Sequence, residues 1–348
     1  MHRRLVVAIA SCALVVVASG AGAQPLREVF RRTNPSVVLI RTTAEVPASG
    51  PDAAGATSRL DGVGSGVLVS ADGKVVTAAH VVQSNATIEV SFLDGEPIPA
   101  TVVSMAPSAD IALLQLERVP RGASVASFGN SDLLDIGDQV FTIGAPYGAN
   151  HSLAVGWISA RRQPSQVYED ATPLEVFQTD LDIFEGNSGG PLFNLDGDVV
   201  GIVTHVLRGA EGGGGPSFSV AGNVVRRLML DERRPWFGVE SFMLDGALAQ
   251  AFNLPQPAGM LVQTVAAGSI AARLGLRGGT VPATVTDIPL LLGGDVLLEV
   301  LGAPVVASAS FMSDFLAALD RVRVGDTVSL RVWRGGSIVT LNATVTPP

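Results

Sequence analysis

The sequence predicts a β-rich domain of sandwich or barrel architecture, followed by a smaller domain that mixes helices and strands. From Gly62 to about Leu228, short apolar and β-branched runs alternate with turn signals such as ADG at 71–73, a pattern typical of sandwiches and barrels. Beyond this region, segments with helical spacing alternate with strand-like runs. The 348 residues fit two compact domains better than one, and 39 glycines and 21 prolines agree with many turns.

The first domain is expected to begin with a short helix from Leu26 to Thr33 and a strand from Ser36 to Thr42. The stretch from Ala44 to Asp61 is rich in Ala, Gly, Pro and Ser without periodicity, so we expect a flexible loop there. A helix from Asn223 to Met229 is expected to close the domain. The strand-like runs between these segments lie at 66–70, 74–78, 87–92, 100–105, 111–116, 139–144, 198–206 and 217–222.

The charged, Pro-terminated stretch from Asp231 to Pro235 is the candidate linker, which places the two domains at 24–230 and 236–348. In the second domain, the run from Thr280 to Leu292 resembles an insertion and has no assigned role. The expected helices of this domain lie at 247–252, 269–274 and 308–319, and its expected strands at 259–265, 295–301, 327–333 and 337–345.

The first 23 residues have the three parts of a secretory signal peptide. Arg3 and Arg4 lie in a basic start, an apolar run follows, and small residues at 21–23 predict cleavage before Gln24. The alternative is an uncleaved membrane anchor, although the apolar run is short for a span. No later stretch is long and apolar enough to cross a membrane, so we expect a product outside the cytoplasm with no membrane span after signal cleavage.

The single cysteine, Cys12, lies inside this signal, so the expected mature chain has no disulfide, no thiol nucleophile and no cysteine-based metal site. The formal net charge is -9, and no run of basic residues is present. Nucleic-acid binding needs clustered Lys and Arg to neutralise phosphates, so this class of function is excluded. We expect no metal and no cofactor.

The strongest local signal for chemistry is the segment EGNSGGP at 185–191, which places Ser188 among small residues. A serine hydroxyl is a poor nucleophile and must be positioned and activated. Small residues permit a tight turn that can aim the amides of Gly186 and Ser188 at one point, where a carbonyl oxygen would become negative during acyl transfer. The alternative interpretation is an ordinary glycine-rich turn.

A nucleophilic serine needs a base, and the expected mature chain has three histidines, at positions 80, 151 and 205. His80 lies at the end of a strand-like run, in TAAHVV, and Asp110 begins the apolar run DIALLQL. Either residue alone could be an ordinary core or turn residue. The order His80, Asp110, Ser188 is that of the chymotrypsin group of serine proteases.

The three blocks TAAHVV, DIALLQL and GNSGGPL together resemble the active-site blocks of trypsin-like proteases in their bacterial HtrA (Deg) branch. The signal segment, the strand SVVLIRT, the run GSGVLVS and the segment GAPYG at 144–148 also resemble that branch. The second domain resembles its single C-terminal PDZ domain. The likeness covers about residues 28 to 346.

This resemblance implies an all-β trypsin-like double β-barrel protease domain, with the triad in the cleft between the barrels, followed by a small α+β PDZ domain. It implies that His80 is the general base, that Asp110 orients it and that Ser188 is the nucleophile. The implied oxyanion hole uses the amides of Gly186 and Ser188, with Asn187 between them.

The implied function is an ATP-independent serine endopeptidase of the periplasm that degrades unfolded or damaged proteins through an acyl-enzyme. The resemblance also implies a homotrimer, or an oligomer built from trimers. Two alternatives remain open: a non-proteolytic periplasmic chaperone or peptide sensor, and a regulatory protease that makes a single signalling cut. The intact triad argues against the first, and the expected absence of a membrane anchor weakens the second.

Two acidic residues depart from the HtrA pattern. Glu185 stands where relatives usually have Pro, and it could change the resting conformation of the oxyanion loop or have no effect. Asp182 lies six residues before Ser188, where in trypsin an acid selects Lys or Arg at the base of the specificity pocket. The alternative, which we favour, is that Asp182 points elsewhere and the enzyme prefers small aliphatic residues, because a buried unpaired carboxylate is costly.

The implied PDZ domain would bind the C-terminus of an extended peptide by adding it to a sheet edge. Phe311, Phe315 and Leu319 recur at four-residue spacing on the helix expected to form one wall of the groove, although such a stripe also suits a core. The loop expected to hold the terminal carboxylate consists of Trp236, Phe237, Gly238 and Val239.

Overall fold

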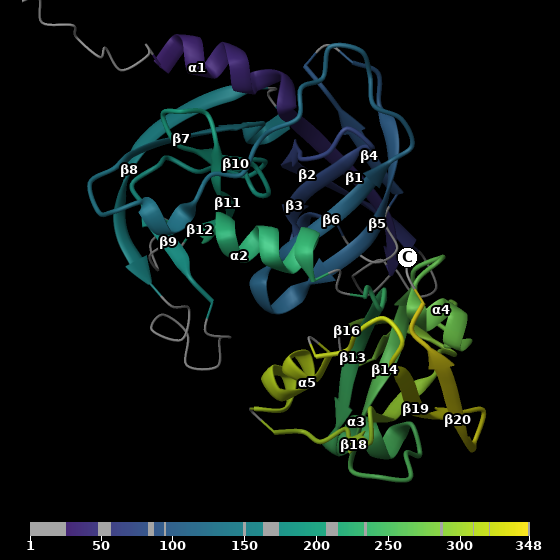
Figure 1. Ribbon diagram of the computed structural model, residues 1–348. Coiled ribbons are helices and arrows are strands. Elements are labelled where there is room, and N and C mark those ends of the chain that lie inside the picture. The colour runs from purple at the N-terminus through teal and green to yellow at the C-terminus, as the bar shows by residue number, and fades with distance from the viewer. Residues whose placement is uncertain are drawn as a thin grey trace, which may run out of the picture.

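The computed structural model describes residues 26–47, 57–82, 87–93, 95–148, 151–162, 174–206, 215–232, 235–285, 288–308, 310–319 and 321–346. The expected signal peptide at 1–23 and most of the glycine run at 212–215 lie outside these ranges. Figure 1 shows two barrels next to each other and a smaller C-terminal unit below them. Within the described ranges, no helix is long and apolar enough to cross a membrane.

The first barrel closes in the order β1-β2-β3-β6-β5-β4, with every pair antiparallel. Its interior is filled by aliphatic side chains such as Ile40, Leu68 and Leu114, none of which is exposed. Two short 3₁₀ turns, η2 (Ala79–Val81) and η3 (Pro107–Ala109), lead out of β3 and into β6. The strands are β1 (Val37–Pro47), β2 (Thr57–Leu68), β3 (Lys74–Ala78), β4 (Thr87–Ser91), β5 (Ile98–Ala106) and β6 (Ile111–Leu116).

The second barrel closes in the order β10-β11-β12-β9-β8-β7. Two closed six-stranded barrels confirm the expected trypsin-like double barrel. Two further 3₁₀ turns in this half are η4 (Ser131–Leu133) and η5 (Pro146–Gly148). Its strands are β7 (Gln139–Gly144), β8 (Ser152–Arg162), β9 (Val176–Thr179), β10 (Pro191–Phe193), β11 (Val199–Val206) and β12 (Ser217–Ala221).

One hydrophobic cluster joins the two barrels. It contains Val76 and Ile111 from the first barrel and Phe141 and Phe193 from the second, and the two phenylalanine rings stack with centroids 5.2 Å apart. Val29 of helix α1 (Leu26–Thr33) is fully buried in the same cluster. The helix confirms the expected lead-in segment, and the shared cluster holds both barrels in one packed unit.

Helix α2 (Gly222–Arg226) continues as a π-helical turn over Arg227–Asp231, close to the closing helix expected at Asn223 to Met229. The expected flexible loop from Ala44 to Asp61 is wrong at both ends. β1 runs to Pro47 and β2 begins at Thr57, because the two strands pair in register out to Pro47↔Thr57. Cross-strand hydrogen bonds therefore extend the hairpin through residues whose composition predicts a loop.

The C-terminal unit is a sheet in the order β13-β14-β17-β19-β20, with β18 paired to β17. Its bounds lie within a few residues of the predicted elements. The strands are β13 (Val239–Asp245), β14 (Ala258–Val265), β17 (Val296–Val300), β18 (Ala303–Pro304), β19 (Thr327–Arg334) and β20 (Ser337–Thr344). The helices are α3 (Gly246–Ala251), α4 (Ile270–Leu274) and α5 (Phe311–Leu319).

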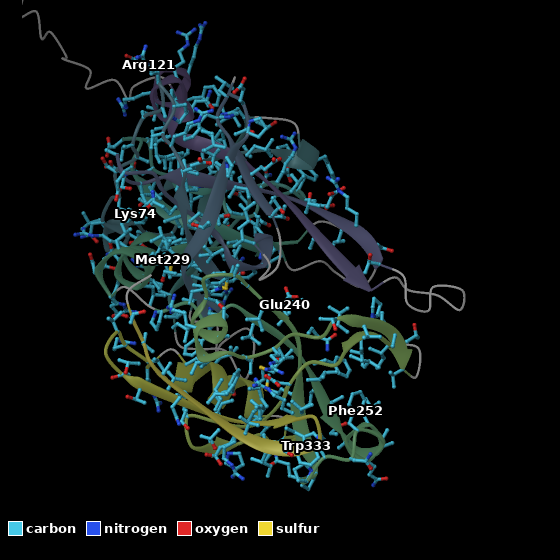
Figure 2. All side chains as sticks on the ribbon, turned by 90° about the vertical axis from the view of Figure 1, so that its right-hand side faces the viewer. Lys74, Arg121, Met229, Glu240, Phe252 and Trp333 are labelled. Carbon is cyan, nitrogen blue, oxygen red and sulfur yellow. The ribbon has the colours of Figure 1, made fainter. Side chains whose placement is uncertain are left out.

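The insertion-like run from Thr280 to Leu292 forms a hairpin of β15 (Val281–Val285) and β16 (Ile288–Leu292). Leu290 is buried in a small second cluster of the C-terminal unit, against which Phe252 and Trp333 pack; these two residues are labelled in Figure 2. On its other side, β16 contacts β1 of the first barrel. The insertion therefore links the C-terminal unit to the barrels.

A buried ion pair fixes the end of β19 in the C-terminal unit. Asp295 is 1% exposed, and both of its oxygens accept hydrogen bonds from Arg334, at 2.6 and 2.7 Å. Asp295 also accepts from the backbone N–H of Arg277 at 2.8 Å. Removing the cation would leave a buried carboxylate without its counter-charge, which is strongly destabilising.

We therefore expect Arg334→Ala to lower the free energy of unfolding of the C-terminal unit by about 3 kcal/mol. Arg331→Ala, which breaks the more exposed pair with Glu299 on the same strand, is the matched control and should cost about 1 kcal/mol or less. Urea denaturation followed by tryptophan fluorescence measures both changes. Equal losses in the two variants would contradict the role assigned to Asp295.

Candidate active site

His80 and Asp110 are placed by neighbouring strands of the first barrel. β3 and β6 pair at Ala78↔Ile111, so η2, which carries His80, and the residue before β6 lie at the same end of the strand pair. Asp110 adopts a left-handed conformation with φ 54°, which turns its side chain toward η2. One carboxylate oxygen accepts from the backbone N–H of His80 at 3.0 Å, and the other lies 2.8 Å from His80 Nδ1.

This double contact fixes the orientation of the imidazole ring. With Asp110 ionised, Nδ1 carries the proton and donates a hydrogen bond to the carboxylate. Nε2 is then unprotonated and can act as a base. The hydrogen bond that the His80 ring donates to Asp110 raises the pKa of His80 above its ordinary value, burial partly offsets this rise, and the negative charge of Asp110 adds to it. His80 and Asp110 are thus arranged as a base and the acid that orients it.

Ser188 lies between β9 and β10, in a loop whose glycines are required by close packing. Gly186 has φ +97°, and a Cβ there would lie 2.1 Å from the carbonyl oxygen of Ala145. Gly189 has φ +84°, and a Cβ there would lie 2.2 Å from Thr77 Oγ1 and 2.3 Å from the oxygen of Ser65. Any side chain at either position would displace the loop, so glycine at both positions follows from the geometry.

The loop directs two amides outward. The carbonyl of Glu185 accepts a hydrogen bond from the N–H of Tyr147 at 2.7 Å. In a trans peptide the N–H points away from the C=O, so the N–H of Gly186 in the same peptide points in the opposite direction. Among the residues that the structure describes, the amides of Gly186 and Ser188 donate to no partner. They are thus available to stabilise a negative oxygen. Asn187, which lies between these two donors, uses its own N–H within the loop, where it donates to the oxygen of Phe184 at 3.0 Å.

Sequence reasoning missed Ser65, a fully buried residue of β2 that holds this loop. Its hydroxyl donates to the oxygen of Gly186 at 2.6 Å and accepts from the N–H of Ala145 at 3.0 Å. Its own N–H donates to the oxygen of Ser188 at 2.8 Å. The one available signal was the position of Ser65 within GSGVLVS, just before the histidine block.

Ser188, His80 and Gly186 line one cleft of about 190 Å³, walled on one side by β1 and β2. The hydroxyl of Ser188 donates to the oxygen of Thr204 in β11, at 3.2 Å. Among the described residues no hydrogen bond joins Ser188 Oγ to His80, and hydrogen bonds between catalytic groups commonly tighten only when substrate binds. The cleft therefore contains a serine, a base with an orienting acid, and two outward-facing amides.

Asp182 and Glu185 are both exposed, but they differ in their position relative to the cleft. Glu185 is among the residues that line the cleft, whereas Asp182 is not. The exposure of Asp182 agrees with the alternative in which its carboxylate is not buried at the base of a specificity pocket. Its effect on the choice of cleaved bond stays a prediction.

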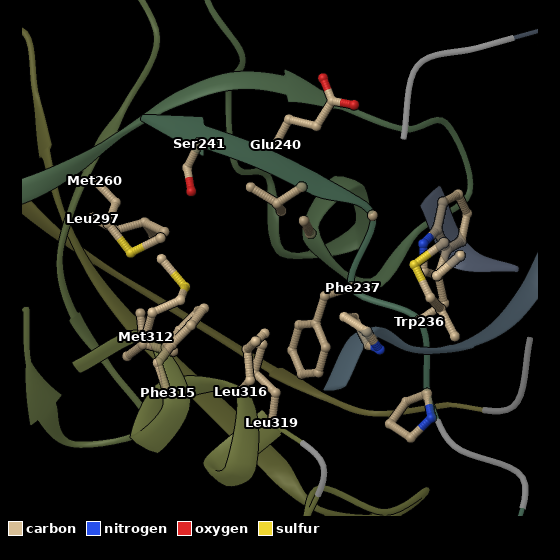
Figure 3. A pocket seen from close by; sticks show the side chains of 18 of the residues that line it. Trp236, Phe237, Glu240, Ser241, Met260, Leu297, Met312, Phe315, Leu316 and Leu319 are labelled. Atoms are coloured by element: carbon tan, nitrogen blue, oxygen red, sulfur yellow. The ribbon is translucent and has the colours of Figure 1, made fainter. Parts of the chain in front are cut away.

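A second groove, of about 500 Å³, lies between β13 and α5 and is shown in Figure 3. Trp236, Phe237, Gly238 and Val239 line one side of it. The opposite wall is formed by apolar residues of α5: Met312, Phe315, Leu316 and Leu319. Met260 of β14 and Leu297 of β17 also line the groove. Phe311, which was expected in this wall, instead lies in the hydrophobic core, 8% exposed and stacked on Phe315.

The loop at the end of this groove has its carbonyls engaged and its amides free. The oxygens of Trp236 and Phe237 accept from the N–H groups of Ile270 and Ala271, at 3.3 and 3.2 Å. Within the described part of the chain, the amides of Phe237 and Gly238 donate to no partner. Two free amides at the end of an apolar groove can hold a carboxylate.

The groove also reaches the first barrel. His80 and Asp110 are among its lining residues, and Trp236 packs against the core cluster of that barrel. Helix α5 contacts η3, the turn immediately before Asp110. The two candidate sites are therefore separated by little more than the His80–Asp110 pair.

Comparison with known proteins identifies a peptidase domain in this chain and similar proteins in other organisms. The profile described as a trypsin-like peptidase domain matches residues 64–202. A probable periplasmic serine endoprotease, DegP-like, from Pseudomonas fulva (strain 12-X) is 35% identical over 303 residues, covering 85% of this chain and 58% of that protein. One of the same description from Chlamydia pneumoniae is 33% identical over 288 residues, covering 81% and 54%. The chain thus spans less than two thirds of these relatives.

Among solved structures, the HtrA-type protease AlgW with a decapeptide is 29% identical, with a TM-score of 0.52, covering 93% of this chain and 99% of AlgW. AlgW with a tripeptide is 28% identical, with a TM-score of 0.50 and coverage of 93% and 98%. Both structures agree with the two barrels followed by a smaller unit.

The raised pKa of His80 can be measured directly. We expect the His80 ring to titrate above its ordinary pKa of about 6.5, because Asp110 stabilises the imidazolium. In Asp110→Asn the pKa should fall, so the protonated fraction near pH 7 decreases. NMR titration of the His80 ring protons measures both values, with His80→Gln identifying the resonance. An unchanged pKa in Asp110→Asn would show that the contact at 2.8 Å has no electrostatic effect.

Proposed function

Because the chain carries a trypsin-like peptidase domain and is a homologue of the HtrA-type serine endoproteases, we propose that it is a periplasmic serine endopeptidase. Its substrates are unfolded or damaged proteins, and it uses no ATP. The observation that carries this function is one cleft that is lined by Ser188, Gly186 and His80, with His80 held from behind by Asp110 and the amides of Gly186 and Ser188 without a partner among the described residues.

In this mechanism Ser188 Oγ attacks the carbonyl carbon of the peptide bond while Nε2 of His80 takes the hydroxyl proton. Asp110 holds the ring and stabilises the imidazolium. The carbonyl oxygen becomes negative and accepts hydrogen bonds from the amides of Gly186 and Ser188, a contribution of about 100- to 1000-fold for one such donor. His80 then protonates the leaving amine, and water hydrolyses the acyl-enzyme by the same steps.

The C-terminal unit would act as a PDZ domain over residues 236–348, joined through the linker at 231–235, in a chain secreted by cleavage of the signal at 1–23. An extended peptide would pair with β13, place its last carboxylate on the amides of Phe237 and Gly238, and place apolar side chains against α5. Support comes from the groove and from the solved AlgW structures that contain peptides. We also propose a homotrimer, or an assembly of trimers, with α1 near the contact.

Loss of the nucleophile tests the peptidase. We expect Ser188→Ala to reduce digestion of a reduced, unfolded model protein by about 10⁴-fold or more, because the hydroxyl that forms the acyl-enzyme is lost. Ser337→Ala, at an exposed position in β20, should leave digestion unchanged. Fragment analysis by mass spectrometry measures both. Digestion by Ser188→Ala at the parent rate would refute the assignment, and cutting of one folded target alone would favour the signalling protease.

Binding of a peptide to the Ser188→Ala protein tests the groove between β13 and α5. We expect a fluorescent peptide with an apolar last residue and a free carboxylate to bind about 10-fold or more tightly than its amidated form, because the amide removes the charge. Phe315→Ala should weaken binding by a similar factor through lost apolar contact. Asp314→Asn, on the same helix but outside the groove, is the matched control. Equal binding of both peptide forms would argue against a carboxylate site.

A further inference from the structure

Glu185 places a carboxylate in the cleft that contains Ser188. Of the lining residues, all within the described part of the chain, Glu185 is the one with a carboxylate. Its backbone carbonyl accepts a hydrogen bond from the N–H of Tyr147, so the loop holds the backbone of Glu185 at the edge of the cleft. No hydrogen bond or ion pair joins its carboxylate to another described residue, so its side chain is available to a substrate in the cleft.

The walls of this cleft suit a long side chain with a cationic end. Leu60, Val63, Ala44 and Val81 supply apolar surface. Lysine and arginine pack their aliphatic stems on such surface while their charged ends stay in contact with solvent or an acid. A volume of about 190 Å³, open to solvent, accommodates such a side chain, with Glu185 available to its charged end.

The cleft lies on the leaving-group side of the cleaved bond. His80 must protonate the leaving amine, so the residues after the cleaved bond pass His80 as they leave Ser188. Val81, which follows His80, and the hairpin of β1 and β2 line the cleft. None of its lining residues belongs to β11, the strand that contacts Ser188 on the other side through Thr204.

Nearby charges do not cancel that of Glu185. Arg59 and Asp61 flank Leu60 on β2, but they pair with each other at 2.7 Å and neutralise one another. His80 is neutral in the form that accepts the serine proton. Glu185 is therefore the charged residue that lines the cleft, and the carboxylate of Asp110, behind His80, has the same sign.

We propose that this cleft is the binding site for the side chain of one of the first two residues after the cleaved bond, and that Glu185 makes it select lysine or arginine over acidic residues. The carboxylate of Glu185 attracts the cationic end of a lysine or arginine and repels an acidic side chain at the same short distance, and this difference gives the selectivity. Because it rests on the peptidase function proposed for this chain, the test must separate loss of selectivity from loss of cleavage.

The experiment uses the full chain and a set of internally quenched peptides with one common acyl side, taken from a mapped cleavage site. The first and second positions after the cleaved bond carry Lys, Gln or Glu in turn. For the parent we expect kcat/KM to be roughly 5- to 25-fold higher with Lys than with Glu, as for unit charges about 4 Å apart in a high dielectric. In Glu185→Gln this ratio should fall to about 1, whatever the variant does to the overall rate.

Asp182→Asn is the matched control, since it removes an exposed carboxylate three residues away that lies outside the cleft, and it should keep the parent ratio. High salt should reduce the ratio in the parent and leave Glu185→Gln unchanged. Loss of the ratio in Asp182→Asn instead, or equal cleavage of Lys and Glu peptides by the parent, overturns the role of Glu185 and leaves the peptidase intact.

A second measurement does not need turnover. In Ser188→Ala, an uncleaved fluorescent Lys peptide, amidated to prevent capture in the C-terminal groove, should bind more tightly than the Glu peptide by a similar factor. The additional change Glu185→Gln should remove that difference. Peptide binding without cleavage by the parent would refute the proposed peptidase, whereas cleavage without charge preference would refute only the specificity.

Discussion

The hydroxyl of Ser65 joins the two barrels at the point where the nucleophile lies. It belongs to β2 of the first barrel, yet it donates to Gly186 and accepts from Ala145, both of the second. The backbone N–H of Ser65 adds a bond to Ser188. Since His80 and Asp110 also come from the first barrel, these three hydrogen bonds set the position of the nucleophile relative to its base.

Close packing reinforces this link. Gly189 lies against Thr77 and Ser65, at distances that leave no room for a Cβ, and the cluster around Phe141 and Phe193 fills the space behind it. The loop can therefore present the amides of Gly186 and Ser188 without support from substrate. This is the preorganisation that electrostatic stabilisation of an oxyanion requires. The side chain of Glu185 is left at the open edge, where it contributes charge to the cleft.

Much of this arrangement could be predicted from the sequence, because short motifs encode local geometry. The order of His80, Asp110 and Ser188, and the double barrel, followed from three blocks and their resemblance to known proteases. The hydrogen bond from the Asn187 amide to Phe184, the place of Phe311 and the length of the β1–β2 hairpin could not be predicted in this way. Each depends on a partner distant in sequence or on the direction of one backbone amide, and composition reports neither.

The contact between β16 and β1 has a consequence for the order of events during folding. Every strand of both barrels lies before position 222, so in a chain exported N-terminus first the barrels can close while the C-terminal unit is still crossing the membrane. β16 is completed only at Leu292 and then meets a strand from the beginning of the chain. Docking of the C-terminal unit is therefore a late step, and a partly exported chain would hold a formed cleft before its peptide groove exists.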